Sequence, residues 1–301
     1  MKKMSKIILL LFISFIVSFA QFSSASANDK STVRFAVIGD YGSGKRAERD
    51  IALLVKGWNP DFITTLGDNN HPVGSAETID RNIGQFFHEY ISFYKGMYGS
   101  GATTNRFFPI PGHRDWDTNK LQPYLDYFTL PGNERYYDFT WGPVHFFMLD
   151  TDEREPDGAT VFSTQGEWLR RKLAESTSPW NLIYAHHAPY LSRKMDGFPR
   201  MRWPFKDWGA HAVLSGFYHV YERLSIEGIP YFINGVGGSS ITGFGKINPN
   251  SQFRYNKDYG AMLVVASNSQ ITFRFINRKG KNIDSYTVHK SKVDSPSRKT
   301  P

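Results

Sequence analysis

Residues 62–71 read FITTLGDNNH, and residues 33–40 read VRFAVIGD. Each stretch is a short apolar run, typical of a β-strand buried on both faces, that ends in Gly-Asp. Similar runs end in polar residues at 107–115 (FFPIPGHRD), 182–187 (LIYAHH) and 212–219 (AVLSGFYH). Polar groups that follow several parallel strands gather at one edge of the sheet. The sequence therefore predicts a ligand site at the carboxyl ends of buried strands.

Helical periodicity occurs between these apolar runs. Residues 46–58, 79–94 and 164–175 each place apolar side chains on one face of a helix. Strands that alternate with helices predict an α/β layered fold. We expect the strand-rich region 229–288 to supply the second sheet of a sandwich rather than a separate domain.

The first residues have the organisation of an export signal. Three lysines precede an apolar run over 7–19, and small residues at 25–27 then provide a cleavage site. This order predicts a signal peptide over residues 1–27, with cleavage near Ala27 and export to the periplasm or the medium. A membrane anchor is the alternative, but the run is shorter than the roughly 20 residues that a spanning helix needs. We therefore expect no stable membrane anchor.

Composition narrows the function classes. The chain of 301 residues has no cysteine, which excludes thiolate nucleophiles and cysteine-based zinc sites. The formal charge is +8, or +8 − 3 = +5 without the three lysines of the signal peptide, and this modest basic excess fits an anionic substrate or an anionic cell envelope. Because the basic residues are scattered, we expect no nucleic-acid binding. Polar residues 291–301 lack periodicity and are predicted to be disordered, which leaves 28–290 as one domain. The sequence carries no sign of the oligomeric state.

Two aspartates and two histidines are the strongest candidates for metal ligands. Asp40 and Asp68 follow glycines at strand ends, and His186 and His219 lie at or just after later strand ends. One aspartate in such a place often only caps a helix, but buried carboxylates that converge need a partner or a metal. Carboxylate and imidazole together suit iron, zinc or manganese. If Asp68 lay between two ions, it could bridge them as in two-metal hydrolases.

Five motifs stand in the order of a known family: Gly39-Asp40, Gly67-Asp68-Asn69, Gly112 to Asp115, His186-His187 and Gly216 to His219. They resemble the calcineurin-like metallophosphoesterases, and the aromatic-rich context is most similar to the purple-acid-phosphatase branch. That branch reads GD, GDxxY, GNH(D/E), a His-His pair and GHxH. The resemblance spans about residues 33–223. It implies a four-layer αββα sandwich with a dinuclear metal centre, at which a metal-bound hydroxide attacks the phosphorus of a small phosphorylated substrate.

The resemblance assigns Asp40, the bridging Asp68 and His219 to the first metal ion. The tyrosine that the family has three residues after the bridging aspartate is His71 here. Histidine can ligate the same ion, although without the phenolate the purple colour would be lost. The alternative for His71 is a surface loop position before Pro72.

The resemblance leaves the second metal site incomplete. His186 matches its family counterpart, and His113 takes the place of the family's asparagine and could still ligate through a ring nitrogen. The first histidine of GHxH is Phe217 here, and a phenyl ring cannot coordinate a metal. The second ion is therefore expected to bind weakly, unless Tyr218 or water substitutes.

Arg114 and His187 are the candidate catalytic residues. Arg114 stands where the family has a histidine; its guanidinium cannot donate a proton in turnover, but it can bind phosphate oxygens with a bidentate fork. A salt bridge from Arg114 to Asp115 is the structural alternative. His187 is then the candidate general acid or phosphate contact, and its alternative is an imidazole packed behind His186.

These residues predict a metal-dependent phosphomonoesterase of acid-phosphatase type. A catalytically impaired binding protein with the same fold is the alternative, because Arg114, Phe217 and His71 all depart from the family pattern. An extracellular carbohydrate-binding module would use the aromatic surface, but it leaves the acids at the strand ends unexplained.

Overall fold

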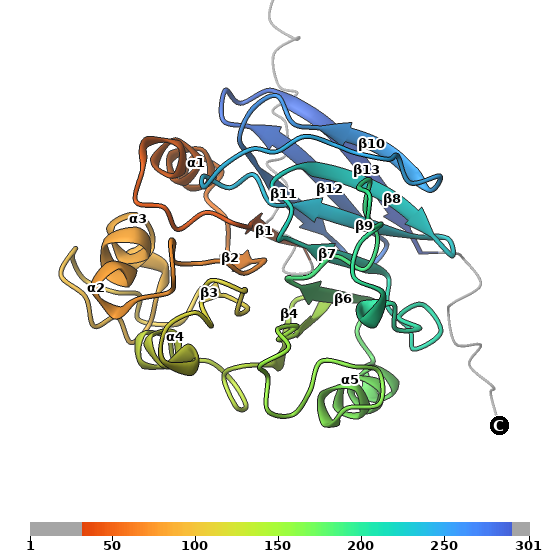
Figure 1. Cartoon of the computed structure of the whole chain (residues 1–301), viewed down its shortest axis with the longest axis horizontal. Helices are drawn as coiled ribbons and strands as arrows, with labels where there is room; N and C mark the ends of the chain where they lie inside the picture. Colours follow the sequence, from red (N-terminus) through yellow and green to blue (C-terminus); the bar gives the residue numbers. More distant parts are fainter. Residues whose placement is uncertain (1–31, 291–301) are drawn as a thin grey trace, which may run out of the picture. The chain divides into compact units, whose positions relative to one another are not determined.

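The computed structural model describes residues 32–290, so the expected signal peptide (1–27) and tail (291–301) lie outside the described residues. Two mixed β-sheets face each other, and helices lie on their outer sides (Figure 1). The predicted four-layer αββα sandwich is confirmed. Among residues 32–290, no helix has both the length and the apolar character needed to span a bilayer.

The first sheet carries the two Gly-Asp motifs. In the described chain its strand order is β13 (Asn282–His289), β12 (Gln270–Asn277), β11 (Gly260–Ala266), β1 (Val33–Ile38), β2 (Phe62–Thr65) and β3 (Phe107–Phe108). Strands β1, β2 and β3 run parallel, whereas β11, β12 and β13 pair antiparallel. The carboxyl ends of β1, β2 and β3 therefore lie at the same edge of the sheet.

The second sheet carries the histidine motifs. Its order is β10 (Ser251–Tyr255), β8 (Tyr221–Ile226), β9 (Ile229–Asn234), β7 (Ala212–Ser215), β6 (Trp180–Ala185), β5 (Val144–Met148) and β4 (Tyr137–Trp141). Strands β5, β6, β7 and β9 are parallel to one another. The His-His pair after β6 and the loop after β7 therefore leave the sheet at one edge, as predicted.

Alternating side chains of the second sheet pack into two cores. Phe146 on β5 faces the first sheet, where its ring centroid lies 5.1 Å from that of Phe35 and 5.3 Å from that of Phe62. The next residue, Phe147, belongs to a separate core that includes buried side chains of α5 (Thr164–Glu175). This alternation is what places one sheet between two apolar layers. The remaining α-helices are α1 (Arg46–Gly57), α2 (Ala76–Ile79), α3 (Gln85–Phe87) and α4 (Gln122–Tyr127), on the side of the first sheet (Figure 1).

The expectation for region 229–288 was wrong in its topology. Strands β9 and β10 join the second sheet, but β11, β12 and β13 join the first. Strand β11 pairs with β1 in antiparallel register, with Val33 opposite Ala266. The C-terminal strands thus cover the edge of β1 that would otherwise leave backbone groups unpaired.

The expected helix over 79–94 is also different in the structure. The helical segment ends at Tyr90 and contains a π-helical turn at Asp80–Gly84. The Tyr94 hydroxyl donates a 2.7 Å hydrogen bond back to the Asp80 carboxylate. The helix ends because Ile91 has an extended backbone, with φ −93° and ψ 125°, and the Tyr94 bond holds the returning chain against the helix.

Candidate metal centre

Loops after three separate strands bring Asp40, Asp68 and His186 together. One ligand atom from each lies within 4.8 Å of the other two. Nε2 of His186 is 3.1 Å from Oδ1 of Asp68, and Nε2 of His219 is 3.3 Å from Oδ1 of Asp40. His71 adjoins them, with its ring centroid 6.4 Å from that of His219. We call these five residues the carboxylate–histidine centre.

The backbone turns sharply at the strand ends that build this centre. Asp40, Asp68 and Phe217 have φ angles of 52°, 51° and 67°, in the left-handed region, and each directly follows a glycine. A side chain in this region costs about 1 kcal/mol, and such strain concentrates at functional sites. The Phe217 N–H donates a 3.0 Å hydrogen bond to Oδ2 of Asp40. The turn therefore holds the carboxylate as well as redirecting the chain.

Gly67 is required where the loops after β2 and β6 meet. A Cβ atom at Gly67 would lie 2.6 Å from Nδ1 of His186 and 2.8 Å from the Cα of Gly112, and the φ angle of Gly67 is +84°. We expect Gly67→Ala to lower the free energy of unfolding by roughly 2 kcal/mol or more. Urea denaturation measures this loss. Gly243→Ala is the matched control, because a Cβ there meets no atom within 4 Å, and an equal loss in both variants would contradict the close approach.

Hydrogen bonds fix how two of the histidines face the centre. Nδ1 of His186 lies 2.7 Å from the Leu66 carbonyl oxygen, which can only accept, so Nδ1 carries the proton. Nδ1 of His219 is hydrogen-bonded to the Ser240 hydroxyl. Both rings therefore present Nε2 to the carboxylates, which is the arrangement found in metal-ligating histidines.

Three buried atoms of the centre make no hydrogen bond of normal geometry among the described residues, although Nε2 of His186 and Oδ1 of Asp40 lie within ion-pair distance of Asp68 and His219. They are Oδ1 of Asp40, Nε2 of His71 and Nε2 of His186. A buried polar atom without a partner is costly, and these three lie in one cluster of carboxylates and imidazoles. A cation in this cluster would supply the missing partner for all three. The residues present therefore fit a metal ion.

The same proximity shifts the protonation equilibria. Burial opposes the charge on Asp68, but the facing His186 holds the pKa of Asp68 well below its ordinary value. Burial likewise opposes the charge on His186, but Asp68 and Asp40 raise the pKa of His186 to about 10. Burial lowers the pKa of His71. Asp68 is therefore held in its ionised form, and its charge attracts a cation, either a proton or a metal.

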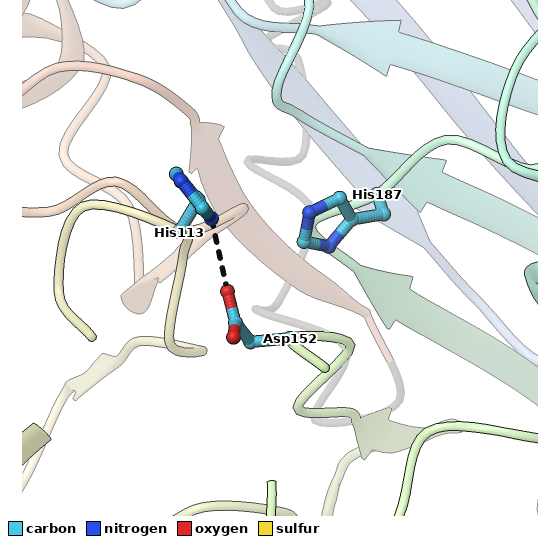
Figure 2. Close-up of side chains that lie close together, drawn as sticks. All are labelled: His113, Asp152 and His187. Carbon is cyan, nitrogen blue, oxygen red and sulfur yellow. Dashed lines mark hydrogen bonds and ion pairs between the residues drawn. The ribbon is translucent and has the colours of Figure 1, made fainter. Parts of the chain in front are cut away.

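A second group lies beside the centre and consists of His113, Asp152 and His187, here called the His113 group. Their ligand atoms also lie within 4.8 Å of one another. Figure 2 shows the three side chains pointing toward one another from separate loops, with Nδ1 of His113 3.1 Å from Oδ2 of Asp152. The described residues thus contain two His/Asp groups that could hold metal ions. His186 belongs to the first group and His113 to the second.

Asp152 was not predicted from the sequence. The signal is the end of β5, because Asp150 and Asp152 are acids that directly follow this strand. Asp150 is instead enclosed; it accepts a 2.9 Å hydrogen bond from Nε1 of Trp116 and a 3.0 Å bond from the Asp152 N–H. The first acid therefore supports the loop, and the second reaches the His113 group.

Aromatic rings fill the space between the two groups. The Phe217 ring centroid lies 5.4 Å from that of His186, 4.8 Å from His187 and 6.3 Å from His113. His187 is buried; its Nδ1 is 2.8 Å from the Thr151 hydroxyl, and its ring also contacts Phe198. Phe217 therefore occupies the position between the groups with an apolar side chain.

Arg114 makes two contacts of different kinds. Its backbone N–H donates a 2.7 Å hydrogen bond to Oδ1 of Asp68, and its side chain pairs with Asp117 at 3.2 Å. The alternative salt bridge to Asp115 is wrong, because Asp115 is buried and accepts hydrogen bonds from Asn69 and Gly112. The Arg114 side chain is 47% exposed, so its guanidinium is open to an approaching anion.

Comparison with known proteins gives distant relatives. The chain matches no protein-family model. It is 24% identical over 302 residues to tartrate-resistant acid phosphatase type 5 of Mus musculus, covering 84% of this chain and 89% of the relative. The corresponding protein of Homo sapiens is 23% identical over 302 residues, covering 83% and 89%.

Solved structures show the same fold. A purple acid phosphatase from yellow lupin (Lupinus luteus) seeds superposes with a TM-score of 0.69 at 18% identity, covering 86% of this chain and 54% of that one. GAP50, described as the anchor in the inner membrane complex of Plasmodium, gives a TM-score of 0.68 at 19% identity, covering 87% and 90%. Taken with the motif order and the geometry of the carboxylate–histidine centre, these matches identify the chain as a distant homologue of the tartrate-resistant and purple acid phosphatases, with the metallophosphoesterase fold.

Proposed function

We propose that this protein is a metal-dependent phosphoesterase that hydrolyses phosphate monoesters. The observation that carries the proposal is the cluster of buried ligand atoms of Asp40, His71 and His186, which make no hydrogen bond of normal geometry, beside the Asp68 carboxylate. Structural packing alone does not account for such a cluster, whereas a hydrolytic metal centre does. The homology to acid phosphatases supports the choice of a phosphate ester as substrate.

The carboxylate–histidine centre would hold the metal ion, and its oxygen and nitrogen donors suit iron, zinc or manganese. A bound ion of this kind supplies Lewis acidity and lowers the pKa of water. Arg114 contributes an exposed guanidinium, which forms charge-assisted hydrogen bonds with phosphate oxygens. Burial lowers the pKa of His187, which favours the neutral imidazole, so His187 would contact a phosphoryl oxygen rather than act as the general acid.

Hydrolysis of para-nitrophenyl phosphate tests the proposal. Protein stripped with a chelator is expected to be inactive, and added Mn²⁺, Zn²⁺ or Fe²⁺ is expected to restore turnover, because the centre needs a cation to orient substrate and activate water. Release of para-nitrophenolate measures the rate. Turnover that survives complete metal removal, or none with any metal over a broad pH range, would count against the proposal.

A binding protein without turnover is the second candidate. Phe217 favours it, because a phenyl ring between the two groups leaves that position without a metal ligand. GAP50 shares the fold and is described as an anchor. Metal and phosphate binding with no hydrolysis of any phosphate ester would support this second candidate.

A further inference from the structure

The carboxylate of the His113 group, that of Asp152, is hydrogen-bonded to the guanidinium of Arg154. Nε of Arg154 donates a 2.6 Å hydrogen bond to Oδ1 of Asp152, and Nη2 donates a 2.9 Å bond to Oδ2. The backbone N–H of Arg154 donates a further 3.0 Å hydrogen bond to Oδ1 of Asp152. The Asp152 side chain is only 4% exposed. Both oxygens of a buried carboxylate are therefore engaged by one bidentate arginine.

The same guanidinium also contacts His113. Nη2 of Arg154 lies 3.2 Å from Nδ1 of His113 and 2.8 Å from its carbonyl oxygen. A metal ion held by Asp152 and His113 would need the atoms that Nη2 contacts. It would also lie next to a fixed positive charge, because a guanidinium does not lose its proton in proteins. Arg154 therefore opposes a second cation in two ways.

Phe217 stands where a further ligand for a second metal ion would be needed. Its ring lies among the imidazoles of His113, His186 and His187 and offers no lone pair. The His113 group thus has a neutralised carboxylate and an apolar neighbour. Phe217 also borders His186 of the carboxylate–histidine centre, but the contacts of the Asp40 and Asp68 carboxylates there are with imidazoles and backbone N–H groups and not with an arginine side chain.

Arg154 and Arg114 are joined through one carboxylate. Oδ1 of Asp117 accepts a 3.0 Å bond from Nη1 of Arg154, and Oδ2 accepts a 3.2 Å bond from Nη1 of Arg114. The two side chains remain 39% and 47% exposed. Asp117 therefore holds the guanidinium groups of Arg114 and Arg154 near each other. Arg114 also contacts the carboxylate–histidine centre, because its backbone N–H bonds to Asp68.

We propose that Arg154 takes the place of a second metal ion in this protein. The chain binds a single ion at the carboxylate–histidine centre, and Arg154 acts with Arg114 as the binding site for the phosphate group of the substrate. This inference rests on the proposed function. Four of the five N–H groups of Arg154 already bond to Asp152, Asp117 and the His113 carbonyl, so the remaining N–H of Nη1 is the one available to a phosphate oxygen, together with the exposed guanidinium of Arg114. Held by these bonds, the Arg154 guanidinium supplies the fixed positive charge and the orientation that a second cation would supply.

Metal content and phosphate binding test the inference without turnover. Equilibrium dialysis with Mn²⁺ or Zn²⁺ is expected to give one ion per chain for the wild-type protein and a second, weaker ion for Arg154→Ala. Calorimetric titration of the metal-loaded protein with inorganic phosphate is expected to show affinity about 10- to 100-fold weaker in Arg154→Ala, because charge-assisted hydrogen bonds are lost.

Two further variants control the experiment. Arg154→Lys keeps the charge but cannot bond to Asp152 and Asp117 at once as the planar guanidinium does, so it is expected to exclude the second ion but to bind phosphate more weakly than wild type. Arg170→Ala removes an exposed arginine that pairs with Glu167 on α5, and neither readout is expected to change. Circular dichroism verifies the fold of each variant; should Arg154→Ala not fold, Arg154→Lys and the metal content of the wild type carry the test.

Two ions per wild-type chain would overturn the inference, as would unchanged phosphate affinity in folded Arg154→Ala. Absence of phosphatase activity would not, because it bears on the proposed function alone. Conversely, an active enzyme that binds two ions would retain the function and refute the role of Arg154.

Discussion

Replacing Asp68 with asparagine is expected to lower kcat/KM for a phosphate monoester by about 10³-fold or more, the scale of the several kcal/mol that a metal ion contributes. The reason is the position of Asp68, whose Oδ1 faces Nε2 of His186 at 3.1 Å and accepts the Arg114 N–H at 2.7 Å. An amide at this position can still accept that hydrogen bond. It cannot supply the negative charge that holds a cation.

The fold of Asp68→Asn is expected to survive, because the amide has nearly the same shape and keeps an acceptor oxygen. Steady-state kinetics and metal content by mass spectrometry would be measured on the same preparation. Asp50→Asn is the matched control, since Asp50 lies on α1 and pairs with Arg46 and Arg278 at the surface. Wild-type activity in Asp68→Asn would show that hydrolysis occurs elsewhere.

The proximity of the principal ligands could be predicted from the sequence. Asp40 and Asp68 end apolar runs that are too uniformly buried to be amphipathic helices, and parallel strands bring such ends to one edge. Strand β1 has the predicted bounds, Val33–Ile38, and α5 has the predicted bounds as well. Local sequence patterns were sufficient to predict the bounds of these two elements, because the apolar spacing within each segment determines whether it forms a strand or a helix.

Features that depend on loops and on pairing between sheets could not be predicted in this way. Arg154 follows β5 in a charged stretch that reads as a solvated turn, and only the tertiary fold places it against Asp152 and His113. The partition of 229–288 between two sheets likewise depends on β11 reaching β1, far away in sequence. Alternating apolar residues identify a strand, but they do not identify its neighbour.

Metal affinity is expected to rise by about tenfold for each pH unit between about pH 6.5 and about pH 8.5, because one proton must leave before His186 can ligate. Asp68 and Asp40 raise the pKa of His186 to about 10, so Nε2 is protonated in the metal-free protein over this range. His219 adds to the slope near neutral pH: burial opposes its charge, but Asp40 still raises its pKa. His71 does not, because burial lowers its pKa.

Calorimetric titration with Mn²⁺ in buffers of different ionisation enthalpy measures the protons released, and at least one per ion is expected at pH 7.5. His186→Asn should reduce this number, whereas His145→Asn, at a histidine paired with Asp138 away from the centre, should not. An affinity independent of pH would mean that His186 is not a ligand.

The same proton gives the metal-free protein a stability that depends on pH in the opposite direction. A histidine whose pKa is raised on folding stabilises the folded state fully below its unfolded value of about 6.5, and this contribution is lost as the pH rises toward the folded value. The contribution of His186 should therefore lower the free energy of unfolding of the chelated protein as the pH rises from about 6.5 to about 10. Metal-loaded protein should be spared this loss, because the ion replaces the proton between Asp68 and His186. Thermal unfolding across this range, with and without chelator, separates the two cases, and parallel curves would exclude competition between proton and metal at His186.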